Sequence, residues 1–254
     1  MTRIWAIASN TFREAIRDRI LYLLLVFALA FIGLAQILSL LTVGSEEKII
    51  KDLGLASISL FGVLTSIIIG VSLVSKEIDR RTIYTIVSKP IHRYEFVLGK
   101  YFGLALTLLV NTAVMTFWFY VILLLKGFGD ARLLLAVYMI FLELLLVTAL
   151  AIFFSSFSTP MLSALFAFSL YLVGHLSWSL NLLRDRLAGA AGKWVCRGLY
   201  LVLPNLEIFN IKGEIVHRMP LPPGLALWAT VYLAGYGAAV LIAACWIFQR
   251  RDFS

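Results

Sequence analysis

Charged residues are scarce in this chain of 254 residues: Asp, Glu, Lys and Arg make up 14% of the sequence, and hydrophobic residues make up 61%. A soluble domain carries about 25% charged residues. Together with a mean hydropathy of +0.95, this scarcity predicts an integral membrane protein. The net charge of +8 does not indicate a nucleic-acid partner, because basic residues in membrane proteins set the topology and contact anionic lipid head groups.

The sequence also lacks the common catalytic motifs. Its two cysteines, Cys196 and Cys245, have no metal-binding or redox spacing. The three histidines, His92, His175 and His217, fall in three different segments and form no H-E-x-x-H motif. There is no G-x-x-x-x-G-K-[ST] phosphate-binding loop. We therefore expect a chain that is not an enzyme, holds no metal or cofactor, and does not hydrolyse nucleotide.

Long apolar segments dominate what is present. Each is long enough to cross a hydrocarbon core of ~30 Å at ~1.5 Å per residue. A spanning segment must satisfy its own backbone hydrogen bonds, so the fold is predicted to be all-α, a polytopic membrane protein forming one domain over residues 1–254. The six expected spans cover residues 20–43, 55–75, 101–125, 133–154, 161–180 and 224–248.

Residues 1–19 are predicted to form an amphipathic helix at the membrane surface. Apolar side chains recur there at spacings of three and four, and arginines lie mostly off that stripe. The alternative is a solvated N-terminal tail. The stripe consists of Trp5, Ala8, Phe12, Ile16 and Ile20.

The distribution of Lys and Arg predicts that both termini are cytoplasmic. Residues 1–19 carry four basic residues and residues 76–100 carry six, which places these two segments on the same side. The segment 182–223 also carries six and argues against this orientation. Within it, residues 193–203 are apolar but too short to span, which favours an interfacial or re-entrant helix on the outer face.

Residues 76–100, KEIDRRTIYTIVSKPIHRYEFVLGK, form a charged segment between the second and third expected spans. Ile83, Ile86 and Val87 make a small apolar face at helical spacing. Lys89-Pro90 breaks the segment, and Pro90 is suited to open a second helix that runs into the third span. A short helix with an exposed apolar face and charged flanks fits a protein surface, whereas a bland charged loop needs none of these features.

Glu143 is the single acidic residue deep inside an expected span. A carboxyl group there is expensive, so it is expected to face the protein interior or a water-filled path. One reading is a substrate, ion or proton site. The other is a structural hydrogen bond between helices, for example to Asn111. His175, near the outer end of the fifth expected span, is a further candidate for the path, although an interfacial histidine needs no special explanation.

The segments TFREAIRDRILY, KEIDRRTIYTIVSKPIHRYEFVLGKYFG and LPNLEIFNIKGEIV, with QRRDF after the last span, resemble ABC-2-type permeases, the membrane subunits of exporter-type ABC transporters. The resemblance covers nearly the whole chain. The finer resemblance, partly through EEKIIKDLGLASISLFG, is to permeases like that of the nitrous oxide reductase copper-maturation system. Because Met and His are few, copper is not inferred as the cargo.

The resemblance implies a complex of two six-helix permease subunits, either two copies or two related chains, with two cytoplasmic ATPase subunits that hold ATP and Mg²⁺. It also implies short outer helices between spans five and six. The segment after span two would be the coupling helix, and Ser155 to Pro160 the second inner loop. The implied coupling residues are Glu77, Arg80, Arg81, Thr82, Ile83, Tyr84, Ile86, Lys89 and Pro90.

Three functional hypotheses follow. The first is a non-catalytic permease subunit of an ABC transporter in the cell inner membrane, in contact with lipid and with a possible periplasmic accessory protein. The second is a proton- or ion-coupled secondary transporter that uses Glu143. Such carriers usually contain a pair of helices broken by Gly or Pro near the middle of the membrane, and the sequence shows no such pair. The third is an intramembrane enzyme, for which Glu143 and Asn111 would be a minimal pair.

Overall fold

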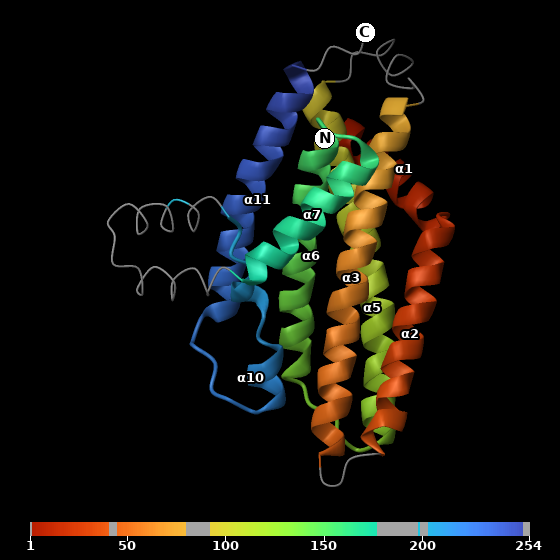
Figure 1. The fold of residues 1–254 in the computed structure, drawn as a ribbon, viewed down its shortest axis with the longest axis vertical. Helices are drawn as coiled ribbons and strands as arrows, with labels where there is room; N and C mark the ends of the chain where they lie inside the picture. Colours follow the sequence, from red (N-terminus) through yellow and green to blue (C-terminus); the bar gives the residue numbers. More distant parts are fainter. Residues whose placement is uncertain (1, 41–44, 80–91, 177–197, 199–202, 251–254) are drawn as a thin grey trace.

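The computed structural model describes residues 2–40, 45–79, 92–176, 198 and 203–250 (Figure 1). These residues contain helices and connecting segments but no strand, which confirms the all-α prediction. The elements are α1 Thr2–Ile16, α2 Arg19–Ser39, α3 Glu46–Asp79, α5 Arg93–Leu125, α6 Leu133–Ser155, α7 Pro160–His175, the 3₁₀ helix η1 Leu206–Phe209, α10 Lys212–Val216 and α11 Leu225–Arg250.

Five of the described helices are long and apolar enough to cross a membrane, namely α2, α3, α5, α6 and α11. The described part of the fifth expected span is shorter: α7 has 16 residues and ends at His175, and residues 177–180 lie outside the description. Proline begins this helix because it lacks the N–H that a first helical turn leaves unpaired. In Figure 1, α7 runs obliquely and ends partway along the bundle.

Helices α3 and α6 form the centre of the bundle and pack through small residues on α3. A Cβ atom placed on Gly62 would lie 2.7 Å from Leu144 of α6, and one on Gly70 would lie 3.3 Å from Ala151. Between them, the hydroxyl groups of Ser66 and Thr148 lie 2.9 Å apart. Small residues four apart let two membrane helices approach closely, and the hydroxyl pair adds a polar contact. Helix α3 therefore packs closely against α6.

The N-terminal helix α1 packs on the first turns of α5. A Cβ atom on Gly103 would lie 2.6 Å from the carbonyl oxygen of Ala8. The buried face of α1 is therefore made of small residues, Ala8, Thr11 and Ala15, whereas Trp5 is 69% exposed. The predicted helix is present, but its expected stripe does not lie on one outward side, because Trp5 is exposed and Ala8 of the same stripe is buried against Gly103. Its place at the membrane surface stays a prediction.

Helix α5 begins before the expected third span, at Arg93 rather than at residue 101. His92 is its N-cap, and the carboxylate of Glu95 accepts a hydrogen bond from the His92 backbone N–H at 3.0 Å. The predicted continuous run through Tyr94, Phe96 and Val97 into the span is confirmed. Pro90 lies outside the described residues, so the helix start predicted at that residue stays a prediction.

The last part of the segment before α11 packs into the bundle. The interfacial or re-entrant helix predicted over residues 193–203 lies outside the described residues apart from 198 and 203. Leu206 and Phe209 of η1 have no exposed surface, and Ile215 of α10 is 2% exposed. Both elements pack against α6. A Cβ atom on Gly174 of α7 would lie 2.7 Å from Leu206, which shows how closely η1 approaches the end of α7. The short helices implied by the resemblance are present here, as parts of the core.

Several helix ends meet at one end of the bundle. Figure 1 places the C-terminal ends of α3 and α11 and the N-terminal end of α5 together, with α1 crossing near them. The linker between α5 and α6 lies at the opposite end. Which side of the membrane this end of the bundle faces stays a prediction.

Candidate functional site

Glu143 lies near the middle of α6 and is buried inside the bundle. It is 1% exposed. At ~1.5 Å per residue, it lies about 15 Å from the start of the helix at Leu133 and about 18 Å from its end at Ser155. A carboxyl group at this depth needs a partner, because an isolated charge in an apolar environment is strongly disfavoured.

That partner is His175, the last residue of α7. Its Nε2 lies 2.7 Å from Oε1 of Glu143. His175 lies at the end of the described part of the fifth expected span, and its side chain reaches α6. Its depth relative to the membrane surface stays a prediction. The contact with Glu143 depends on the oblique path of α7 (Figure 1), which the hydropathy pattern does not contain.

Glu207 of η1 completes a chain of three titratable side chains. Its Oε2 lies 3.3 Å from Nδ1 of His175. The amide of Asn210 donates to the other oxygen, Oε1, at 3.1 Å. The imidazole thus stands between two carboxyl groups that come from elements far apart in the sequence. We name Glu143, His175 and Glu207 the carboxyl–imidazole chain.

A lysine and an aromatic ring border this chain. The Lys212 ammonium of α10 donates to the hydroxyl of Ser59 on α3 at 3.0 Å. The ring of Tyr171 packs edge-on against the imidazole of His175, with 4.8 Å between ring centroids. Two carboxyl groups, one imidazole and one ammonium therefore gather where α3, α6, α7, η1 and α10 meet.

The sequence reasoning missed Glu207 and Lys212 as parts of this site. Both lie in a segment that was expected on the outer face. The only signal available was LEIFNIKGE, in which charged residues alternate with apolar ones, as in a chain that is half buried. Asn111, the expected partner of Glu143, is 3% exposed, and neither polar atom of its side chain has a hydrogen-bond partner among the described residues.

A second charged cluster joins the start of α3 to the α5–α6 linker. Lys51 is 2% exposed, and its ammonium lies 2.6 Å from Glu47 and 3.5 Å from Asp130. Arg218 binds the same oxygen of Glu47 at 3.0 Å. The backbone N–H of Arg132 donates to Asp130, and with the nearby Lys51 it lowers the pKa of that carboxyl group. We name Glu47, Lys51, Asp130 and Arg218 the end cluster.

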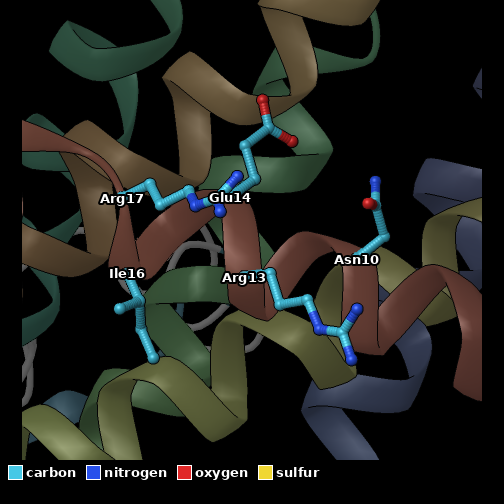
Figure 2. A pocket seen from close by; sticks show the side chains of 5 residues that line it. All are labelled: Asn10, Arg13, Glu14, Ile16 and Arg17. Atoms are coloured by element: carbon cyan, nitrogen blue, oxygen red, sulfur yellow. The ribbon is translucent and has the colours of Figure 1, made fainter.

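A cavity of about 590 Å³ lies along the polar face of α1. Figure 2 shows the five side chains that line it, Asn10, Arg13, Glu14, Ile16 and Arg17. Glu14 also approaches the ammonium of Lys100 on α5 at 3.6 Å, although Lys100 is 1% exposed. This ion pair fixes α1 to α5 beside the two glycines of α5.

The predicted coupling residues fall largely outside the described part of the chain. Residues 80–91 are not described, and this range holds Arg80, Arg81, Thr82, Ile83, Tyr84, Ile86, Lys89 and Pro90. Glu77 lies in the last turns of α3, where only the backbone is described. Their proposed role stays a prediction. Within the described residues, no group of three or more His, Cys, Asp or Glu side chains is arranged to hold a metal ion.

The five long apolar helices and the shorter α7 define a multi-pass membrane protein. The sequence model of the family described as ABC-2 family transporter protein matches residues 5–253. The chain therefore belongs to the ABC-2 family of transporter proteins and is an ABC permease subunit. Among curated proteins, no match was found.

Proposed function

We propose that this chain is the permease subunit of an ATP-driven exporter and that a separate cytoplasmic ATPase supplies the energy. ATP and Mg²⁺ would bind to that partner, and the permease would not itself be catalytic. The observation that carries the proposal is the family match over residues 5–253, because this family supplies the membrane component of ABC transporters.

The packing of α3 provides a route for the coupling motion. The helix runs without interruption from Glu46 to Asp79, directly before the predicted coupling residues. Its close contacts with α6 at Gly62 and Gly70 lie one helical turn before and after Ser66. The Ser66 hydroxyl bonds that of Thr148, which follows Glu143 on α6. A rigid helix pair of this kind transmits a displacement at one end to the carboxyl–imidazole chain.

Helix α1 would move with the same input. It packs on Gly99 and Gly103 of α5, shortly after the predicted coupling residues end. Its ion pair between Glu14 and Lys100 adds a second tie. We infer that α1, α3 and α5 respond together when the ATPase closes.

The assembly follows from the same proposal. Two copies of this chain, or this chain and a related permease, would form the membrane unit in the cell inner membrane, with both termini cytoplasmic and with lipid around them. A periplasmic accessory protein is a further possible partner. The finer resemblance to permeases of the nitrous oxide reductase copper-maturation system stays a prediction.

Co-purification with the ATPase tests the proposal. The cognate ATPase is co-expressed with the permease, and the tagged permease is purified in detergent. Replacing Ile83 and Ile86 together by Asp is expected to remove the ATPase from the complex, because two charges would interrupt the apolar face. Thr85→Asp introduces one negative charge in the same segment but off that face, and it is expected to retain the ATPase. Equal retention by both variants would remove the docking claim.

A second candidate is favoured by the contact between Glu143 and His175, since titratable groups inside a membrane mark proton relays and ion paths. It is a proton-coupled secondary transporter that needs no ATPase. It predicts transport in liposomes without ATP, driven by a proton gradient and lost in Glu143→Gln. Transport that requires ATP and the ATPase subunit decides for the first candidate.

A further inference from the structure

The hydrogen bonds of the carboxyl–imidazole chain require one proton more than two ionised carboxyl groups and a neutral imidazole carry. Each ring nitrogen of His175 lies within hydrogen-bond distance of a carboxyl oxygen. An ionised carboxylate is only an acceptor, and a neutral imidazole carries one N–H. With both carboxyl groups ionised and a neutral ring, one of the two contacts would join two acceptors. An additional proton must therefore reside on the ring or on one carboxyl group.

The exposure of the three side chains decreases steadily along the chain. The Glu207 side chain is 40% exposed, that of His175 is 21% exposed, and that of Glu143 is 1% exposed. The contacts thus lead from the surface of the chain, through both nitrogens of one ring, to a carboxyl group near the middle of α6. This is the arrangement that a proton needs in order to reach a group that water does not contact.

The second oxygen of Glu143 gives a physical reason to protonate this carboxyl group. Oε2 is buried and has no hydrogen-bond partner among the described residues. A buried carboxylate oxygen without a donor is costly, whereas a protonated carboxyl group removes the charge. A proton delivered to Oε1, the oxygen that faces His175, would therefore lower this cost.

We propose that Glu207 and His175 form a proton relay that loads and unloads Glu143. The site takes a proton, and its function is to change the charge at the centre of α6 during the transport cycle. This deepens the proposed function but does not rest on the ATPase partner, since proton uptake is a property of the permease chain alone.

The transfer balances in protons and charge. The proton on Oε2 of Glu207 passes to Nδ1 of His175, so an O–H bond breaks and an N–H bond forms. The proton on Nε2 passes to Oε1 of Glu143, so an N–H bond breaks and an O–H bond forms. The imidazole is neutral before and after, and the negative charge has moved from Glu143 to Glu207.

Five elements surround the ring of His175. The titratable and charged groups that face it come from α6 (Glu143), α7 (Tyr171), η1 (Glu207) and α10 (Lys212), and α3 contributes the Ser59 hydroxyl.

Infrared difference spectra after a pH jump test the relay on the full permease chain, purified in lipid nanodiscs. The wild type is expected to show the C=O stretching band of a protonated carboxyl group, and the band disappears in Glu143→Gln. In Glu143→Asp the band shifts, which identifies it even if the Gln variant folds poorly. His175→Gln and Glu207→Gln are expected to slow the formation of the band by about 100-fold, the usual contribution of a positioned proton-transfer group.

Glu214→Gln, in α10 next to the same site, is the matched control and should keep the wild-type rate. Absence of a band assigned to Glu143 would overturn the proposal. So would equal rates in His175→Gln, Glu207→Gln and Glu214→Gln. If the relay test fails and the ATPase still co-purifies, the permease assignment stands. If the ATPase does not co-purify and the relay test succeeds, the relay stands.

Discussion

The two charged clusters of this protein differ in how their charges are neutralised. The end cluster has two carboxylates and two permanent cations, Lys51 and Arg218. Both of its carboxylates keep some contact with solvent, since the side chains of Glu47 and Asp130 are 35% and 19% exposed. The carboxyl–imidazole chain instead places a titratable ring against a carboxyl group that is 1% exposed.

This difference assigns a structural role to the end cluster and a role that depends on protonation to the carboxyl–imidazole chain. The ion pairs of the end cluster tie the start of α3 to the α5–α6 linker and to Arg218, the residue that follows His217. The carboxyl–imidazole chain can change its proton content, because imidazole is the side chain whose ordinary titration falls near neutral pH. Only the second cluster has a member near the middle of a long apolar helix, Glu143 of α6.

The largest expected effect is that of His175→Leu. This substitution leaves the Glu143 carboxyl group buried with no partner, and removing one member of a buried pair costs about 3–5 kcal/mol. The free energy of unfolding, measured by denaturant titration in mixed micelles, should fall accordingly. His217→Leu, at an exposed histidine at the end of α10, is the control and should change little. Similar losses in both variants would contradict the assigned role of the buried pair.

Gly174→Ala is expected to move η1, which carries Glu207, away from α7, which carries His175. A Cβ atom there would lie 2.7 Å from Leu206 and 3.0 Å from the carbonyl oxygen of Pro204, so η1 must move away from α7. Overpacking of this kind costs about 1–3 kcal/mol. Thermal unfolding in detergent measures it, with Gly235→Ala as the control, because nothing lies within 4 Å of a Cβ atom at that position. An unchanged unfolding temperature in Gly174→Ala would show that η1 adapts freely.

Lys51→Met tests the end cluster and should cost less than His175→Leu. The carboxylates that lose their partner are partly hydrated, so the expected loss is about 1 kcal/mol. The same denaturant titration measures it, with Lys48→Met on the exposed side of α3 as the control. A loss as large as that of His175→Leu would remove the distinction between the two clusters.

The smallest expected effect is the pH dependence contributed by Asp130. Its pKa is lowered, first by the backbone N–H of Arg132 and further by Lys51, so its stabilising contribution is full above the ordinary value of 3.8. The contribution is lost as the pH falls through the lower value of the folded state. Asp130→Asn should flatten the acid limb of the stability curve. An acid limb identical to that of the wild type would show that Asp130 does not contribute.

Most of the fold could be predicted from the sequence because membrane insertion depends on properties of single segments. Length and hydropathy predicted the ends of α2, α3, α5, α6 and α11 to within a few residues. The exceptions are the starts of α3 and α5, which lie earlier in the chain than predicted. The depth of Glu143 followed from the same count. The family resemblance was confirmed by the match over residues 5–253.

The partners of Glu143 were beyond this reasoning. His175 and Glu207 reach it only because α7 is short and oblique and because η1 enters the bundle through the space beside Gly174. Such contacts join residues that are 32 positions apart, and a pattern read along the chain carries no information on them. The sequence alone determined that a carboxyl group lies in the membrane. The tertiary structure decided that it faces an imidazole, because packing alone sets which helix ends meet.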